Sequence, residues 1–259
     1  MTLPSPDTFA TFLRTFAVWL ATFLWLVVFF VPAGPLVIGC CFLPARYRCH
    51  FLRVILLRFG QSMTRWIWRP FFRVRYEDRT GGERAPGIVV ANHRAAIDAF
   101  LVSAPGLSMA QTVNGWPMRL PVIGWVARLA GYLNITEWDY AMLKSRAEAV
   151  LQVGDMIVSY PEGTRSESPA MNHFRSGIFH IAKEMELPVY MLCIAGDEYM
   201  PDRRFRFREF RDVMIRFIGP VSAEEVRETV TAYALKKRVF RRMADELAEM
   251  DAELARGGA

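Results

Sequence analysis

Hydrophobic and polar positions divide the chain into two parts that meet near residue 75. Residues 16–43 contain no charged side chain and are dense in Phe, Trp, Leu and Val. Between residues 75 and 221, short β-branched runs such as residues 88–90 and 156–160 alternate with longer segments of helical character. This alternation predicts an α/β fold with a central, mostly buried β-sheet flanked by helices, and a C-terminal helix follows after residue 222.

The charge-free segment is interrupted at Pro32 and Pro35. Its first arm, residues 16–31, would be ~24 Å long as a helix. The hydrocarbon core of a bilayer is ~30 Å thick, and the second arm, residues 36–43, is shorter still. We therefore expect an N-terminal helical hairpin that inserts into the membrane from one side. A straight membrane span and a buried helix of a soluble protein are the alternatives.

The next segment is rich in arginine and aromatic residues. Its arginines recur at spacings of four, five and seven, at Arg46, Arg53, Arg58, Arg65, Arg69 and Arg73. Helical arginines with interleaved Trp and Leu suit the headgroup boundary of a membrane, whereas the alternative is a helix face that packs on its own domain. We assign residues 1–74 to a membrane anchor, made of the hairpin and this basic amphipathic helix, and residues 75–259 to the α/β domain.

Composition and charge favour a membrane as the partner. The 259 residues are 53% hydrophobic with a formal net charge of +6, which suits nucleic acid or an anionic membrane surface. The apolar N-terminus favours membrane lipids over nucleic acid. Because most arginines follow the apolar segment, we expect the α/β domain on the cytoplasmic side of a bacterial-type inner membrane. The cysteines have no metal-ligand spacing, which predicts free thiols and no metal site: Cys40, Cys41, Cys49 and Cys193.

A histidine and an aspartate follow the predicted strand at residues 88–90. His93 lies in the turn after the strand, and Asp98 lies in the first turns of the helix expected at residues 95–102. A turn at His93 lets the imidazole fold back over the helix start, where the carboxylate can hold one ring nitrogen while the other faces a substrate. That is the arrangement of an oriented general base, and a structural His–Asp pair is the alternative.

A second polar turn follows the strand at residues 156–160. It reads Pro161, Glu162, Gly163, Thr164, Arg165. The glycine can adopt positive φ and lets backbone approach a ligand. The guanidinium of Arg165 offers a fork of donors suited to a phosphate, although an isolated arginine after a glycine turn is more often a surface charge.

Together the two motifs resemble those of the glycerolphosphate/lysophospholipid acyltransferase family, over roughly residues 75–221. In that family the histidine is the general base, the aspartate orients it, and the Glu-Gly-Thr-Arg turn binds the phosphate of the acceptor. The resemblance gives these roles to His93, Asp98 and the turn from Glu162 to Arg165. It implies transfer of a fatty acyl group from acyl-CoA or acyl-carrier protein to the free hydroxyl of a lysolipid like 1-acylglycerol-3-phosphate. It implies no metal and no further cofactor.

One segment departs from the family pattern. The strand expected at residues 131–136 ordinarily ends in an Asp-Arg pair that helps to bind the acceptor, whereas this chain has Thr136 and Glu137 there. Arg165 remains the clearest phosphate ligand, and Arg146 is a candidate replacement. The departure motivates an alternative acceptor without glycerol phosphate, such as a lyso-aminolipid. A non-catalytic membrane-binding protein with a relic site is a further alternative.

Residues 203–210, which alternate Arg and Phe, predict one more strand.

Overall fold

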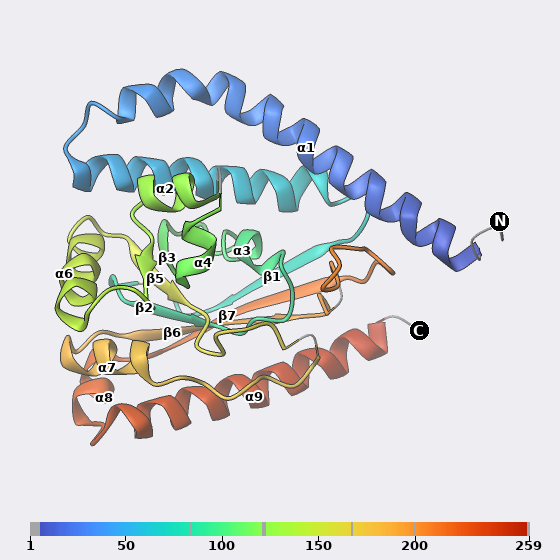
Figure 1. Cartoon of the computed structure of the whole chain (residues 1–259). Helices are drawn as coiled ribbons and strands as arrows, with labels where there is room; N and C mark the ends of the chain where they lie inside the picture. The colour runs from blue at the N-terminus through green and yellow to red at the C-terminus, as the bar shows by residue number, and fades with distance from the viewer. Residues whose placement is uncertain (1–5, 83, 121–122, 167, 199, 258–259) are drawn as a thin grey trace.

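The structure, a computed structural model, describes residues 6–82, 84–120, 123–166, 168–198 and 200–257 (Figure 1). Its centre is a seven-stranded sheet in the order β1-β7-β6-β2-β5-β3-β4. Neighbouring strands pair in parallel except β6 and β7, which are antiparallel. The strands are β1 (Val74–Arg79), β2 (Ile88–Ala91), β3 (Met109–Val113), β4 (Leu133–Asn134), β5 (Met156–Ser159), β6 (Val189–Ala195) and β7 (Val213–Val221).

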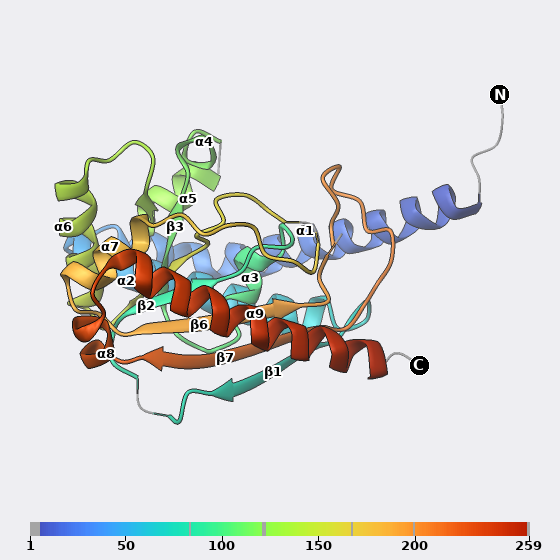
Figure 2. The ribbon, with the colours of Figure 1, turned by 90° about the horizontal axis from the view of Figure 1, so that it is seen from below.

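Helices cover both faces of the sheet. The α1–α2 pair lies over one face and α7 to α9 lie under the other (Figures 1 and 2). Every residue of β2, β5 and β6 is buried, as expected for strands covered on two sides. The helices are α1 (Pro6–Cys40), α2 (Ala45–Ser62) with a π-helical turn (Met63–Ile67), α3 (Asp98–Leu101), α4 (Gly115–Met118), α5 (Ile123–Leu129), α6 (Tyr140–Leu151), α7 (Gly177–Glu184), α8 (Ala223–Glu228) and α9 (Ala232–Gly257). The predicted α/β architecture is confirmed.

The N-terminal hairpin is present, but its turn lies further along the chain than predicted. α1 continues through Pro32 and Pro35, because a proline removes a backbone hydrogen bond but still adopts helical φ. The reversal occurs at residues 41–44, so the second arm is α2 (Figure 1). A 35-residue helix is ~52 Å long at 1.5 Å per residue. By length and composition, the part from Thr8 to Cys40 is sufficient to cross a membrane.

Helix α2 packs on the α/β domain through a buried polar contact. Arg53 donates to the Asp155 carboxylate from Nε (2.7 Å) and Nη2 (2.6 Å), and to the carbonyl of Ala130 from Nη1 (2.9 Å). His50 Nδ1 lies 2.7 Å from the other carboxylate oxygen of Asp155. Arg53, one of the arginines predicted at the headgroup boundary, therefore faces the protein.

The prediction of a strand at residues 203–210 is wrong. The Asp202 carboxylate instead gathers this segment into an irregular turn, because it accepts from the backbone of Arg204 (2.8 Å) and Arg206 (3.1 Å). The same carboxylate binds the guanidinium groups of Arg206 (3.0 Å) and Arg208 (2.9 Å). Phe205 adopts φ 57°, a left-handed conformation that no β-strand contains.

Candidate active site

The turn after β2 brings His93 and Asp98 into contact. His93 Nδ1 lies 2.7 Å from Asp98 Oδ2. The same carboxylate oxygen accepts from the backbone N–H groups of Arg94 (2.9 Å) and Ala95 (3.1 Å), which wrap around it as the chain enters α3. Three donors on one oxygen fix the carboxylate and make Nδ1 the protonated nitrogen of His93. Nε2 forms no hydrogen bond with any described residue and carries the lone pair.

Burial sets the protonation states of this pair. The side chain of His93 is 24% exposed and that of Asp98 is fully buried. Burial lowers the pKa of His93 to about 4, and the nearby charge of Arg165 adds to the effect. Burial raises the pKa of Asp98 to about 6, against the backbone hydrogen bonds that favour its ionised form. At neutral pH the pair is therefore a neutral imidazole beside a carboxylate, the state that a general base requires.

The Pro161 to Arg165 turn lies next to His93, because β5 is the parallel neighbour of β2. Glu162 accepts from the backbone N–H of His93 (2.8 Å) with one carboxylate oxygen and from that of Asn172 (2.8 Å) with the other. It therefore holds the two loops together, and its predicted role in substrate binding stays a prediction. Gly163 has φ 73°, and Thr164 is exposed. The guanidinium of Arg165 lies 5.9 Å from the centre of the Phe205 ring.

Two residues of the site were not predicted from the sequence. The ring of Tyr160 lies over the His93 imidazole, with 4.6 Å between centroids, and its hydroxyl donates to the carbonyl of Asp98 (3.0 Å). Asn92 clamps the neighbouring strand, because its side chain exchanges two hydrogen bonds with the backbone of Ile194 (2.9 and 2.8 Å). Each residue directly precedes one of the two motifs, and this position is the sequence signal that could have identified it.

The segment that lacks the family arginine forms a polar turn beside the site. Asn134 Oδ1 accepts from the backbone of Thr136 (3.2 Å) and Glu137 (3.1 Å). Glu137 in turn pairs with Arg119, at 2.7 Å between Oε1 and Nη2. The turn is linked to the site because Asn114, next to it, donates to the carbonyl of Gly163 (3.5 Å). A carboxylate with an exposed arginine partner thus occupies this place.

Arg146, on α6, lies near this turn. Its guanidinium is 5.8 Å from the centre of the ring of Trp138, the residue after Glu137. Its role as a replacement for the missing charge stays a prediction, and Arg119 is the arginine that pairs with Glu137.

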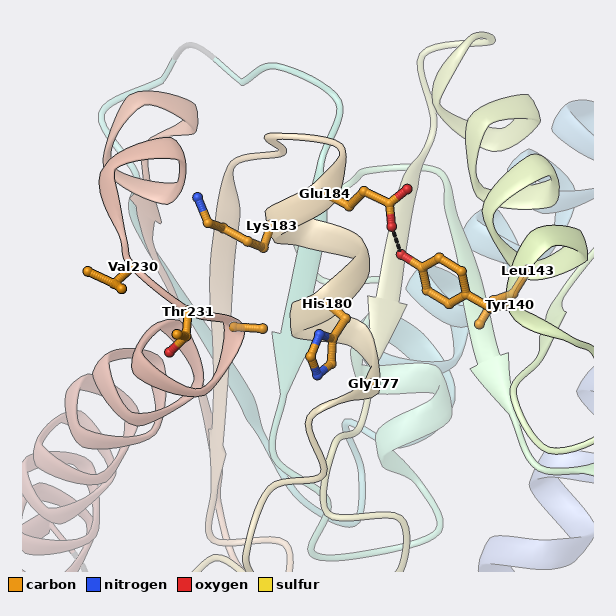
Figure 3. Close-up of a pocket in the computed structure, with 9 residues that line it drawn as sticks. Tyr140, Leu143, Gly177, His180, Lys183, Glu184, Val230 and Thr231 are labelled. Carbon is orange, nitrogen blue, oxygen red and sulfur yellow. Dashed lines mark hydrogen bonds between the residues drawn. The ribbon is translucent and has the colours of Figure 1, made fainter.

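An open cavity of about 540 Å³ lies elsewhere, between α6, α7 and the α8–α9 connection. Figure 3 shows Tyr140 hydrogen-bonded to Glu184 on one wall, Lys183 on the side of Val230 and Thr231, and His180 between them. Because α8 follows Val221, which pairs with Val189 at the start of β6, this cavity lies at the opposite end of the sheet from His93. Among the described residues, no group of His, Cys, Asp and Glu side chains is arranged to hold a metal ion.

Comparison with known proteins agrees with this geometry. The family model described as Acyltransferase matches residues 73–195, a stretch that contains both motifs. This stretch is therefore similar to the acyltransferase family. Among solved structures, the 1-acyl-sn-glycerophosphate acyltransferase PlsC from Thermotoga maritima has the same fold, with a TM-score of 0.74 over 94% of this chain and 97% of that one, at 20% identity.

Two curated relatives differ in the acceptor that their names give. A chloroplastic 1-acyl-sn-glycerol-3-phosphate acyltransferase of Arabidopsis thaliana is 24% identical over 132 residues, which cover 49% of this chain and 37% of that protein. A lyso-ornithine lipid O-acyltransferase of Pseudomonas aeruginosa is 31% identical over 144 residues, which cover 52% of this chain and 54% of that protein. The chain therefore aligns with only part of each of these relatives.

Proposed function

We propose that this protein is a membrane-associated O-acyltransferase. It moves a fatty acyl group from acyl-CoA or acyl-carrier protein to the free hydroxyl of a lysophospholipid such as 1-acylglycerol-3-phosphate. The observation that carries the proposal is the His93–Asp98 contact beside the Arg165 turn, in which Nε2 has no hydrogen bond to a described residue. The match of residues 73–195 to the acyltransferase family model supports it.

The reaction follows from the protonation states of the dyad. Nε2 of His93 takes the proton of the acceptor hydroxyl as its oxygen attacks the carbonyl carbon of the thioester. Asp98 stabilises the imidazolium that forms. Collapse of the tetrahedral intermediate breaks the carbon–sulfur bond, and His93 returns the proton to the leaving thiolate. A base of this kind contributes ~10²–10⁴ in rate. Arg165 binds the acceptor phosphate as a fork of donors.

The membrane role rests on α1. Its exposed apolar side chains suit a bilayer, and its length exceeds the thickness of the hydrocarbon core. The arginines that follow it favour a cytoplasmic catalytic domain at a bacterial-type inner membrane, with membrane lipids as neighbours. If α1 is the anchor, a chain that starts after residue 44 remains in the supernatant with no detergent. A truncated chain that still sediments with membranes would place the anchor elsewhere.

The test is thiol release from a long-chain acyl-CoA by purified protein in detergent, with lysophosphatidic acid as the acceptor. His93→Ala should lower kcat by roughly 10²–10⁴-fold. The matched control is His180→Ala, which removes an exposed histidine at the opposite end of the sheet. Equal rates for the two variants would refute the role of His93. Release with acyl-carrier protein alone would identify the donor, and no release with either donor and any acceptor would support the non-catalytic reading.

A second candidate acceptor is a lyso-aminolipid. Glu137 favours it, because the place of the family arginine holds a carboxylate that pairs with Arg119 at 2.7 Å and therefore offers a phosphate less positive charge than an unpaired arginine would. The relative named as a lyso-ornithine lipid O-acyltransferase supports the same reading. The acceptor panel should therefore include lyso-ornithine lipid beside lysophosphatidic acid. If Glu137 selects the acceptor, Glu137→Arg shifts the ratio of the two rates toward lysophosphatidic acid, and an unchanged ratio refutes that role.

A further inference from the structure

A third carboxyl group lies directly behind the His93–Asp98 pair. Asp197, two residues beyond the end of β6, is fully buried. Its carboxyl group and that of Asp98 are within hydrogen-bonding reach of each other. Yet Oδ1 of Asp98 and both carboxyl oxygens of Asp197 receive no hydrogen bond from an N–H or O–H group of the described residues. Two carboxyl oxygens can bond only when one of them carries a proton.

The surrounding contacts decide which carboxyl group holds that proton. Oδ2 of Asp98 already accepts from His93, Arg94 and Ala95, which is the environment of a carboxylate. Among the described residues, Asp197 has no comparable set of donors. The cation that acts on it, Arg94, is occupied by two other acids. It binds Asp251 through two contacts of 2.9 Å and makes a short contact with Glu198. A carboxylate at residue 197 would be buried without compensation.

We propose that Asp197 is a positioning residue of the active site, a neutral carboxylic acid that donates a hydrogen bond to Oδ1 of Asp98 and holds that carboxylate against His93. This inference rests on the function proposed above. Burial raises the pKa of Asp197 well above its usual value, and the neighbouring charge of Asp98 acts in the same direction. The charged or titratable groups that couple to Asp197 are Asp98, His93, Arg94, Tyr160 and Glu198.

The arrangement divides the work between the two oxygens of Asp98. Oδ2 receives the imidazole N–H and two backbone N–H groups, while Oδ1 receives the acid proton of Asp197. With every lone-pair direction constrained, Asp98 cannot rotate away when His93 becomes an imidazolium. An apolar residue at 197 would leave Oδ1 as a buried, unsatisfied acceptor, whereas an amide would supply an equivalent neutral donor.

Two variants separate this role from a structural one. Asp197→Asn keeps a neutral donor of the same shape. We therefore expect kcat/KM, and the acid limb of its pH profile (the fall of kcat/KM at acidic pH), to remain close to wild type. Asp197→Ala removes the donor and should lower kcat/KM roughly tenfold to a hundredfold, the effect expected of a buried unsatisfied acceptor. It should also move the acid limb to higher pH, because Asp98 loses a hydrogen bond that favours its ionised form. Asp245→Asn, on the exposed face of α9, is the matched control.

Infrared spectroscopy tests the proton itself without any turnover. The wild type at neutral pH should show the C=O stretch of a protonated buried carboxyl group, and Asp197→Asn should lack it. If Asp197 is ionised instead, the band is absent from the difference spectrum between wild type and Asp197→Asn. In that case the Asn variant also moves the fall of kcat/KM at acidic pH to lower pH, because a negative charge near Asp98 has been removed. Either result overturns the proposal. A wild type with the band but no acyl transfer would overturn only the proposed function.

Discussion

Arg53 and Asp155 offer a direct test of how the N-terminal hairpin is attached. The two side chains are 2% and 1% exposed, and they are joined by contacts of 2.7 and 2.6 Å. Arg53 lies in the middle of α2, whereas Asp155 directly precedes β5, the strand that leads to the Arg165 turn. The perturbation is Arg53→Leu, which keeps an apolar stem but leaves the buried Asp155 carboxylate with His50 as its one partner among the described residues.

The expected cost is large because both groups are out of water. Removing one member of a buried ion pair costs roughly 3–5 kcal/mol, which lowers Tm by about 6–20 °C at ~2–4 °C per kcal/mol for a domain of this size. Replacing both partners by leucine should restore much of the loss, since a well-packed apolar pair is often as stable as the ion pair. The assay is thermal unfolding in detergent, followed by circular dichroism.

Arg58→Leu is the control, because Arg58 lies on the same helix with an exposed side chain. Its substitution should change the free energy of unfolding by no more than about 0.5 kcal/mol. If Arg53→Leu were no more destabilising than Arg58→Leu, α2 would not be held by the α/β domain. If the double variant Arg53→Leu/Asp155→Leu were as unstable as the single one, the loss would come from packing and not from the unpaired charge.

Three further predictions concern the site. The pKa of Asp98 is raised to about 6, so kcat/KM should fall about tenfold per pH unit below about pH 6 and level off above about pH 7. A pH profile without this fall would contradict the role of an ionised Asp98 beside His93. Gly163→Ala should lower kcat/KM, because the glycine has φ 73° and an added Cβ would lie 2.8 Å from Nε of Arg175; unchanged kinetics would show that the turn tolerates the shift. The raised pKa of Asp197 means that the folded chain keeps a proton which the unfolded chain loses above about pH 4, so this group makes the free energy of unfolding fall by ~1.4 kcal/mol per pH unit as the pH rises toward the folded pKa. Denaturant titrations near pH 5 and pH 7 should show that the free energy of unfolding falls less between the two pH values for Asp197→Asn than for wild type. An equal fall in the two proteins would mean that Asp197 does not keep a proton on folding.

Local rules succeeded where a residue and its partner are close in the chain. The contact between His93 and Asp98 depends on one turn and one short helix, and both can be read from residues 88–102. The left-handed conformation of Gly163 follows from the residue type alone. The roles assigned to these residues remain predictions that the experiments above test.

Local rules failed where a contact that is not part of the periodic pattern overrides it. The prolines at 32 and 35 are ordinary breaks in a short helix, but α1 continues past them into its packing against α2. The alternation of Arg and Phe at residues 203–210 suits a strand, yet the Asp202 carboxylate collects its arginines into a turn. In both cases the local sequence suggests one structure, and contacts that this pattern does not include decide for another.

The site itself depends on strand order, which explains why one of its members was missed. β2 ends two residues before His93, β5 ends three residues before Glu162, and β6 ends two residues before Asp197. These strands are adjacent and parallel in the order β6-β2-β5, so their carboxyl ends meet at one edge of the sheet. The first two carry motifs that can be read without knowing the order. Asp197 belongs to the site only because β6 pairs with β2, and from the sequence it is one acid among 26. A polar residue just beyond the end of a strand therefore becomes a candidate for catalysis once that strand is known to adjoin one that carries a motif.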